Sequence, residues 1–316
     1  MEIGLYEGWM KPQVAQLFNK QYGVSEDDFA KLIDDFYELP FQKNKCIRII
    51  AREGDLIIGF QSFFYWPYTF NNQTYNSYQS GNSLVHENYR GKGIFQKLLN
   101  YIDEHSKKLE IDFLVGFPVE QSKNSFIRNN WKNILNLRWY LKIINPAAFL
   151  FNFKELHQSF DALPLVKAED SVSNFLRLHK TEEFNTWRNN YSSAVYFYYN
   201  YTKGDQTITF QLKSNKRNKW FNELIIGDIA CSSFDYQLIK EAFIGLKIKI
   251  RKKLSVTSLT IALNEHTENP LKSILKNLGY IRTKKEIYFI IKSFSDNITI
   301  EDPSKWILYR SDIDTW

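Results

Sequence analysis

Residues 84–99 read Leu-Val-His-Glu-Asn-Tyr-Arg-Gly-Lys-Gly-Ile-Phe-Gln-Lys-Leu-Leu, which predicts a strand, a glycine-bearing loop and then a helix. Gly91 and Gly93 allow the backbone to turn tightly with its N–H groups directed into one concavity. The helix adds its own unpaired N–H groups and the positive end of its dipole. Apolar residues at helical spacing predict its buried face, formed by Ile94, Phe95, Leu98, Leu99 and Ile102. The stretch therefore predicts a phosphate site that needs no metal.

Two predicted strands, residues 77–85 and 111–117, flank this loop and helix. Between them, Arg90-Gly91-Lys92-Gly93-Ile94 resembles the pyrophosphate loop of the GNAT superfamily of acyl-CoA-dependent N-acyltransferases, whose pattern is Arg/Gln-x-x-Gly-x-Gly/Ala. Five positions fit this resemblance, and Phe95 stands where the pattern has its last small residue. The resemblance implies a loop that holds a pyrophosphate, with less room beside position 95.

The composition predicts a globular cytoplasmic protein without metal or disulfide chemistry. The 316 residues are 44% hydrophobic, and 41 basic against 35 acidic side chains give a net charge of +6. This mild excess suits a small anionic ligand and is too weak to indicate nucleic acid. The two cysteines, Cys46 and Cys231, lack a partner motif, and the five histidines do not cluster. The first residues do not resemble a signal peptide, and no apolar run is long enough to cross a bilayer, so no membrane partner is expected.

Residues 1–145 carry an element order that resembles a GNAT domain over their whole length. In order, the predicted elements are a short first strand, helices over 12–21 and 25–39, a hairpin over 46–66, the strand 77–85, the helix after the loop, the strand 111–117, a helix over 119–129 and a strand near 139–144. We therefore expect an α/β (α+β) fold with a mixed, mostly antiparallel sheet flanked by helices.

The rest of the chain predicts a second, degenerate copy of this domain. Residues 146–170 have little periodicity and are predicted to be a linker, and residues 171–316 repeat the order of hairpin, strand, helix and strand. The copy lacks the glycine loop, because only Cys-Ser-Ser-Phe stands between Ala230 and Asp235. We expect two tandem GNAT-like domains, the second of which helps to build the acceptor pocket. The alternative is a structural support or a dimerisation surface, so the chain is expected to be a monomer or a homodimer.

The resemblance implies direct transfer of an acyl group from acetyl-CoA, or from a longer acyl-CoA, to an amine. The strand end at 84–86 would pair with the pantetheine arm, and a backbone N–H near Val85 or His86 would hold the thioester oxygen. Asn124 would contact the same arm. The expected acyl-CoA contacts are Leu84, Val85, His86, Arg90, Gly91, Lys92, Gly93, Ile94, Phe95 and Asn124.

The residues that would move protons depart from the family pattern. Phe126 stands where many GNAT enzymes have a Tyr that serves as the general acid. Gln79 stands where some have a Glu that serves as the general base. His86 is the nearest titratable residue and is the candidate base. Deprotonation of the amine through water is an equal alternative.

The chain has Arg-Gly-Lys-Gly-Ile-Phe in its first half only and ends in Trp306-Ile-Leu-Tyr-Arg-Ser-Asp-Ile-Asp-Thr-Trp316. With these features it resembles, over its whole length, bacterial nucleotide-sugar N-acyltransferases of surface-polysaccharide biosynthesis. This resemblance implies a nucleotide-linked acceptor, in particular a dTDP-linked amino-dideoxyhexose. The expected acceptor contacts are Trp66, Gln79, Gly81, Trp187 and Arg188, of which Arg188 beside an indole suits a phosphate or a nucleotide. Other acceptors remain open, namely an aminoglycoside, a protein amine or a peptidoglycan precursor. A non-catalytic acyl-CoA-binding protein is a further alternative.

Overall fold

The computed structural model of the chain describes residues 1–23, 25–153, 155–166, 175–192, 194–232, 235–294 and 300–316. The first half follows the predicted order of elements. These are β1 (Glu2–Leu5), α1 (Lys11–Tyr22), α2 (Glu26–Tyr37), β2 (Ile47–Glu53), β3 (Leu56–Tyr65), β4 (Tyr68–Phe70), β5 (Gln73–Tyr75), β6 (Ser77–Val85), η2 (Glu87–Tyr89), α3 (Ile94–His105), β7 (Phe113–Gly116), α4 (Glu120–Ile127) and β8 (Lys132–Ile143). Helix α2 begins after Ser25, whose hydroxyl accepts a hydrogen bond from the Asp28 backbone N–H at 3.1 Å.

The second half repeats the order of hairpin, strand, helix and strand. The predicted linker contains η3 (Ala148–Leu150) and η4 (Leu156–Ser159), and its residues 154 and 167–170 lie outside the described part, as do residues 171–174. The elements that follow are β9 (Arg177–Leu178), α5 (Glu182–Tyr191), β10 (Tyr196–Lys203), β11 (Gln206–Asn218), β12 (Phe221–Cys231), α6 (Tyr236–Arg251), β13 (Ser258–Asn264), α7 (Asn269–Asn277), β14 (Ile281–Ser293), η6 (Pro303–Lys305) and η7 (Arg310–Asp312).

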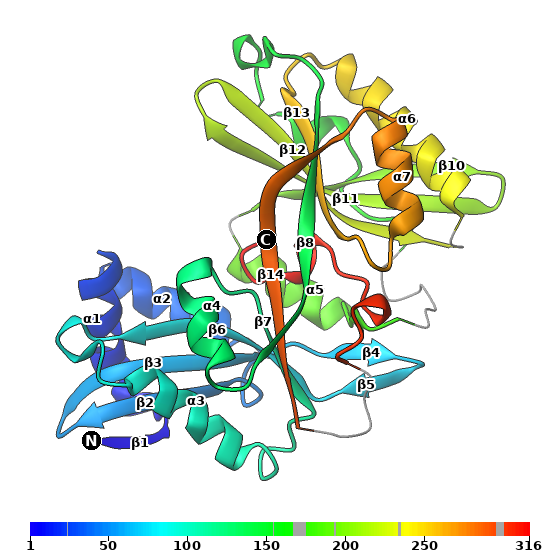
Figure 1. Cartoon of the computed structure of the whole chain (residues 1–316). Coiled ribbons are helices and arrows are strands. Elements are labelled where there is room, and N and C mark those ends of the chain that lie inside the picture. The colour runs from blue at the N-terminus through cyan, green and yellow to red at the C-terminus, as the bar shows by residue number, and fades with distance from the viewer. Residues whose placement is uncertain (24, 154, 167–174, 193, 233–234, 295–299) are drawn as a thin grey trace.

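Both halves contribute to one continuous sheet (Figure 1). Its eleven described strands lie in the order β1-β2-β3-β6-β7-β14-β8-β13-β12-β11-β10. The pairs β6–β7 and β12–β13 are parallel, and the other neighbouring pairs of this sheet are antiparallel. The predicted mixed, mostly antiparallel sheet is therefore confirmed.

The last strand of each half is exchanged with the other half. β14, near the end of the chain, pairs with β7 from Ile290↔Gly116 to Ser293↔Phe113. β8, from the first half, pairs with β13 from Ser258↔Ile143 to Asn264↔Leu137. The two exchanged strands also pair with each other, at the centre of the sheet. Each half therefore depends on a strand that the other half supplies.

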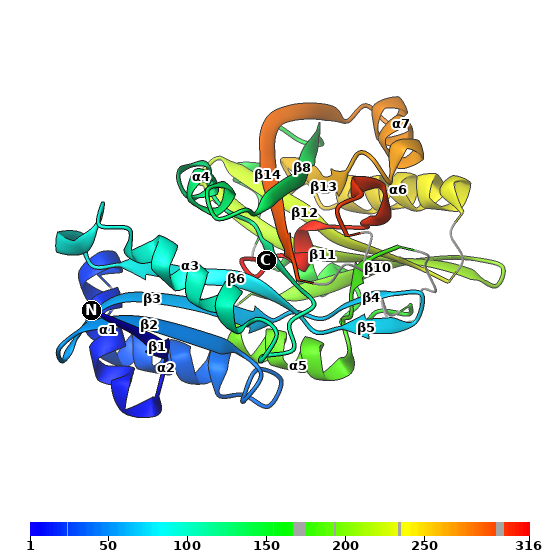
Figure 2. The same cartoon turned by 60° about the horizontal axis from the view of Figure 1, so that its bottom comes forward.

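Helices cover both faces of the first-half strands (Figure 2). α3 and α4 lie on one face, where Ile94, Leu98 and Ile102 pack in one apolar cluster with Phe126. α1, α2 and α5 lie on the opposite face in a second cluster, which also contains Trp306 and other residues of the last part of the chain. The side chains of a strand alternate between these two environments.

Candidate functional site

A split opens between β6 and β7, and we call it the first-half split. The two strands pair in parallel from Ser77↔Phe113 to Ser80↔Gly116, where the ladder ends. β6 continues to Val85 and remains paired with β3 on its other side. Among the described residues, no strand pairs with residues 81–85 on the β7 side. Such an edge can accept an extended chain as an added strand.

A β-bulge marks the start of the first-half split. The register between β3 and β6 shifts after Gly81, and Asn82 has a φ of 49°. The Tyr37 hydroxyl accepts a hydrogen bond from Asn82 Nδ2 at 2.7 Å and donates to Ser62 Oγ at 2.9 Å. Ser62 Oγ donates to the Gly81 carbonyl at 2.9 Å. This connected polar network holds the backbone of the bulge in one conformation.

The glycine-bearing loop lies beyond the other end of residues 81–85. Gly91 and Gly93 have φ values of 76° and 73°, a conformation that other residues rarely adopt, and an added Cβ at either position would meet no atom within 4 Å. Residues 90–93 are exposed, and Gly93 is the N-cap of α3. Open backbone N–H groups at a helix N-terminus suit a pyrophosphate. The loop therefore fits the group that the sequence predicts for it.

Two cationic side chains belong to the same loop. Arg90 Nε donates to the Val85 carbonyl at 3.2 Å, and its guanidinium also contacts the Gln21 side chain of α1. Lys92 Nζ lies 4.6 Å from the centroid of the Tyr89 ring. Both cations are exposed, so they can turn toward an anion held by the loop.

Phe95 and Phe126, which depart from the family pattern, pack against each other. Their ring centroids lie 5.2 Å apart in an edge-to-face arrangement, and Phe126 lies 5.0 Å from Trp131 in the same cluster. Of the predicted buried face of α3, Ile94, Leu98, Leu99 and Ile102 are buried, and Phe95 is partly exposed. Asn124 lies exposed on α4. Position 126 thus provides packing and no proton donor.

His86 lies at the loop end of the first-half split. Its Nδ1 accepts a hydrogen bond from the Asn88 backbone N–H at 3.3 Å, which caps η2. The His86 backbone N–H donates to the Ile58 carbonyl at 2.9 Å. At about 3.3 Å of rise per strand residue, His86 lies about 17 Å from Gly81. The imidazole is therefore close to the predicted pyrophosphate site and remote from the start of the split. Of its strand neighbours, Leu84 is buried and Val85 is partly exposed.

The equivalent split in the second half is filled by the chain itself. β12 and β13 pair in parallel only from Glu223↔Ser258 to Ile226↔Ile261. Residues 306–316, which we call the C-terminal segment, enter beyond that point, where Tyr309 forms a bridge with Leu263. A Cβ on Gly227 would lie 2.1 Å from the Trp316 ring. The second-half split has no space for an acyl-CoA arm. Ser233 and Phe234, in the place of the predicted missing loop, lie outside the described residues.

Three cations gather around the C-terminal segment, and we call Arg188, Lys213 and Arg310 the cation cluster. Arg188 Nη2 donates to the Ile313 carbonyl at 2.5 Å, and its buried Nε and Nη1 have no partner among the described residues. Arg310 Nη2 donates to the Thr315 carbonyl at 2.7 Å, and its buried Nη1 has no such partner either. The cluster therefore holds charged N–H groups in need of an acceptor.

The proximity of these cations changes their proton affinities. Burial, together with the charges of Arg310 and Arg188, lowers the pKa of Lys213 to about 8. Burial and the charge of Arg188 lower the pKa of Arg310 to about 10. A bound anion would raise both pKa values again.

Asp314 is a carboxylate beside the cation cluster, and it meets Gln79 of β6. Gln79 pairs with Val115, one position before the β6–β7 ladder ends. The Asp314 carboxylate lies close enough to this side chain for the amide Nε2 to donate to it, and the buried Gln79 Oε1 has no partner among the described residues. Burial raises the pKa of Asp314, an effect that Gln79, Arg188 and Arg310 only partly offset.

A cavity of about 560 Å³, which we call the split cavity, opens where β7 ends. Ile313 and Thr315, the neighbours of Asp314, are part of its wall. The other walls come from the chain after β7, from β8, from β14 and from η7, with the residues Phe117, Pro118, Val119, Glu120, Trp139, Lys284, Lys285, Glu286, Ile287, Tyr288 and Arg310. The cavity thus extends from the end of β7 to one member of the cation cluster.

The predicted aromatic acceptor contacts are core residues. Trp66 is fully buried, and its Nε1 donates to the Asp312 carbonyl at 2.9 Å. Trp187 is 2% exposed, and its Nε1 donates to the Phe36 carbonyl at 2.8 Å. Gly81 lies against the Phe64 ring, which an added Cβ would approach to 2.4 Å. Of the five predicted acceptor contacts, Gln79 and Arg188 are brought together around the C-terminal segment.

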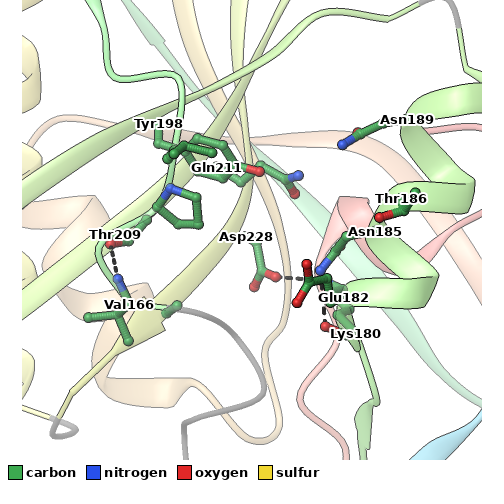
Figure 3. Close-up of a pocket in the computed structure, with 13 residues that line it drawn as sticks. Val166, Lys180, Glu182, Asn185, Thr186, Asn189, Tyr198, Thr209, Gln211 and Asp228 are labelled. Carbon is green, nitrogen blue, oxygen red and sulfur yellow. Dashed lines mark hydrogen bonds and ion pairs between the residues drawn. The ribbon is translucent and has the colours of Figure 1, made fainter.

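A second cavity of about 310 Å³, the α5 cavity, lies between α5 and the strands β10 to β12 (Figure 3). Figure 3 shows Asn185, Thr186 and Asn189 of α5 on one side and Tyr198, Thr209 and Gln211 on the other. These six residues bring amides and hydroxyls to the lining, while Leu163, Pro164, Val166 and Ala230 add apolar surface. Such groups suit a polar ligand with many hydrogen-bonding groups.

Lys180 ties the α5 cavity to the C-terminal segment. Its Nζ lies 2.5 Å from Asp228 Oδ2 and 2.6 Å from Asp312 Oδ1, and it donates to Ser311 Oγ at 2.6 Å. Burial lowers the pKa of Lys180, but the two carboxylates outweigh it and raise the pKa overall. Because all these groups are buried, the network fixes where the segment crosses the second half.

Several residues of the site were not singled out from the sequence. Gln61 and Ser62 interrupt the apolar run of β3, and this polar interruption of a buried strand is a signal for the network at the bulge. Asp314 and Arg310 have no such signal, because nothing in the local sequence places them beside β6 and α5.

Among the described residues, no helix combines the length and hydrophobicity needed to cross a membrane. The described part also contains no group of three or more His, Cys, Asp or Glu side chains that could hold a metal ion.

Comparison with known proteins finds a family match within the first half. Residues 10–128 match the family described as "Acetyltransferase (GNAT) domain". The match contains β6, the glycine-bearing loop, α3, β7 and α4. No curated protein sequence matches the chain.

Solved structures share the fold of the whole chain. A GCN5-related N-acetyltransferase from Anabaena variabilis is 12% identical, with a TM-score of 0.63 over 93% of this chain and 73% of that one. Another from Kribbella flavida is 11% identical, with a TM-score of 0.59 over 92% and 72%. The N-myristoyltransferase of Saccharomyces cerevisiae, solved with bound myristoyl-CoA, is 12% identical, with a TM-score of 0.53 over 97% and 83%. The chain thus carries a GNAT acetyltransferase domain, the domain of an acyl-CoA-dependent N-acyltransferase, within a larger fold that these structures share.

Proposed function

We propose that this acyltransferase N-acylates a nucleotide-linked amino sugar, with the dTDP-linked amino-dideoxyhexoses of bacterial surface polysaccharides as the first candidates. The reaction would take place at the start of the first-half split, in a cytoplasmic enzyme. Residues 10–128, which match the acetyltransferase domain, contain the loop and the split that the acyl donor requires. The acceptor class is inferred from the residues around the C-terminal segment, which lie near the start of the first-half split.

The acyl donor fits between the loop and the bulge. The pyrophosphate of acetyl-CoA or a longer acyl-CoA would lie on the backbone N–H groups of Gly91 to Ile94, with Arg90 and Lys92 as mobile cations. The extended arm would then follow residues 81–85 as an added strand and bring the thioester to the bulge at Asn82. Backbone N–H groups that are fixed around a bulge can stabilise the negative charge that develops on the thioester oxygen.

The cation cluster is the observation that carries the acceptor class. Arg188 Nε and Nη1 and Arg310 Nη1 are buried without partners among the described residues, and Lys213 adds a third charge. Leaving such charged N–H groups unpaired is unfavourable, and a diphosphate supplies the oxygens that would pair with them. A polycationic acceptor such as an aminoglycoside would be repelled from the same place.

The α5 cavity, the cation cluster and the first-half split follow one another in the order of the nucleoside, diphosphate and amino sugar of such an acceptor. Along the β10–β11 ladder, Tyr198↔Gln211 lines the α5 cavity and Tyr196↔Lys213 follows. Two residues of strand span about 7 Å, so the cavity and the cation cluster are close neighbours. A nucleoside in the α5 cavity would place its diphosphate at the cluster and the amino sugar toward Asp314 and the first-half split.

A thiol-release assay tests this proposal. Acetyl-CoA and 3-hydroxybutanoyl-CoA are offered with dTDP-linked and UDP-linked amino sugars, and aminoglycosides serve as controls. We expect release of the CoA thiol with at least one nucleotide-linked amino sugar and none with the aminoglycosides.

The other outcomes separate the alternatives. Release only with an aminoglycoside, a protein amine or a peptidoglycan precursor would reject the acceptor class and keep the enzyme class. CoA binding without thiol release for any amine would favour a non-catalytic acyl-CoA-binding protein. Phe126 is consistent with this alternative, because it lacks the hydroxyl that a general acid at this position would need.

A further inference from the structure

We propose that Asp314, delivered by the C-terminal segment to the side chain of Gln79, is the general base that deprotonates the acceptor amine. The inference rests on the proposed N-acyltransferase function and names the group that the first half lacks. Gln79 stands where some GNAT enzymes have a basic Glu, and an amide cannot take up the proton. The carboxylate that binds this amide is placed to do so.

The position of Gln79 puts the Asp314 carboxylate beside the reaction point. Gln79↔Val115 is the pair before Ser80↔Gly116, the last pair of the β6–β7 ladder. The thioester carbonyl, at the start of the split, would therefore lie next to the side chain that Asp314 contacts. His86, about 17 Å away along β6, cannot reach the same point.

The two substrates would meet from opposite faces of the sheet. α3 and the loop that would hold the pyrophosphate lie on one face (Figure 2). The side chain of Gln79 points to the other face, because its strand neighbour Tyr78 packs in the α3 cluster. Asp314 therefore meets Gln79 on the face from which the acceptor would enter. Ile313 and Thr315 line the split cavity on either side of Asp314, and Asp314 is itself partly exposed, so the split cavity is the side from which an amine would approach this residue.

The groups around Asp314 act on its proton affinity in opposite directions. Its carboxylate accepts from Gln79 of β6 and lies near Arg188 and Arg310, while its backbone carbonyl accepts from the Tyr191 hydroxyl at 2.5 Å. Lys213 of β11 and Tyr196 of β10 lie near these arginines. Burial raises the pKa of Asp314 despite these cations, which strengthens it as a proton acceptor.

The step balances without any further reactant. The ammonium group of the acceptor gives one proton to the Asp314 carboxylate, and the free nitrogen attacks the thioester carbon. A C–N bond forms and the C–S bond breaks. The second proton leaves the nitrogen and reaches the departing thiolate, directly or through water, which gives the amide and free CoA.

The substitution Asp314→Asn tests this assignment. It keeps the size of the side chain and removes its basicity. The variant is assayed with acetyl-CoA and the amine that wild type acetylates fastest in the thiol-release assay. Its kcat should be about 100-fold or more below that of wild type, in the range that general-base catalysis contributes. The acidic limb of the kcat/KM profile that reflects the carboxylate should be replaced by one that follows the titration of the amine, so the rate deficit of the variant should narrow as the pH rises and more of the amine becomes free. Asp314→Glu should retain part of the activity.

Control measurements keep the test interpretable. Glu301→Gln removes an exposed carboxylate that pairs with Lys132, and it should leave kcat unchanged. The affinity of Asp314→Asn for acetyl-CoA and its melting temperature should equal those of wild type, which excludes misfolding. Wild-type kcat and an unchanged pH profile in Asp314→Asn would overturn the assignment of Asp314 and leave the proposed function intact. Absence of thiol release by wild type with every amine would overturn the proposed function, and the base with it.

Discussion

Single residues shape the loop at which we propose that the pyrophosphate binds. Gly93 has a φ of 73°, a backbone conformation that favours glycine. No atom lies within 4 Å of the position that a Cβ would take, so the space beside the backbone is open. The sequence predicted the strand, the glycine-bearing loop and the helix correctly, because Gly91 and Gly93 between a strand and a helix form a local pattern, and the pyrophosphate site in this loop stays a prediction. It did not predict the contact between Gln79 and Asp314, because 235 positions separate the two and only tertiary structure joins them (314 − 79).

Gly93→Asp should weaken acetyl-CoA binding strongly and keep the fold. Asp tolerates a positive φ better than most residues, and its carboxylate would repel a pyrophosphate on the same N–H groups. We expect the affinity measured by calorimetry to fall by about tenfold or more, which corresponds to about 1.4 kcal/mol. Gly204→Asp is the matched control, because Gly204 has a φ of 59° in a hairpin turn of the second half. Equal acetyl-CoA affinities of the two variants would remove the loop from the donor site.

The charge of Lys213 should control the binding of the nucleotide part. Its pKa of about 8 means that the side chain is mostly protonated below that pH and mostly neutral above it. The affinity for dTDP, which has no amine, should therefore weaken as the pH rises from about 7 to about 9, with a midpoint moved upward by the bound anion.

Calorimetry with two variants checks this pH dependence. Lys213→Met should bind dTDP more weakly than wild type at neutral pH and should lose most of the dependence. Lys216→Met is the control, since Lys216 is an exposed residue of the same strand. A dTDP affinity that is the same in all three proteins at every pH would exclude Lys213 from the acceptor site.

At the scale of the element, the C-terminal segment joins the two halves of the site. It fills the second-half split with Tyr309 and Trp316 and then brings Asp314 to β6. The sequence predicted that the second copy is degenerate because a loop is missing. The filling of its split could not be predicted, since it depends on Gly227 leaving space for the Trp316 ring.

Lys180→Met should destabilise the protein strongly. The substitution leaves Asp228 and Asp312 buried without their cation, and breaking a buried ion pair in this way costs about 3–5 kcal/mol. The free energy of unfolding in urea measures this change. Lys203→Met removes the partner of Glu241 at an exposed position and should have a much smaller effect. Similar losses in both variants would show that the Lys180 network does not hold the C-terminal segment.

At the scale of the whole molecule, the exchange of β8 and β14 makes the two halves interdependent. The sequence predicted the strands of both halves but not their final partners. Local periodicity shows that a segment is a strand, whereas the choice between β7 and β8 as a neighbour of β14 is a matter of long-range packing. The division at residues 145 and 171 therefore remains a prediction about sequence repeats, within a sheet that runs through both.

A fragment of residues 1–145 should not fold on its own. In this fragment β7 would lose β14, and β8 would lose both of its neighbours, β13 and β14. Exposed strand edges of this kind favour aggregation. Circular dichroism should show no cooperative thermal transition for the fragment, and co-expression with residues 146–316 should restore a soluble complex. A cooperative transition of the fragment alone would contradict the interdependence of the halves.

The transfer reaction itself is the central claim, and the most direct measurement is the stoichiometry between thiol release and acceptor modification. Wild-type protein is incubated with acetyl-CoA and a dTDP-linked amino sugar, free thiol is quantified, and the sugar is analysed by mass spectrometry. We predict one acetyl group on the amine of the sugar for each thiol released. Thiol release without acetylated sugar, or no release with any nucleotide-linked amino sugar, would contradict the account.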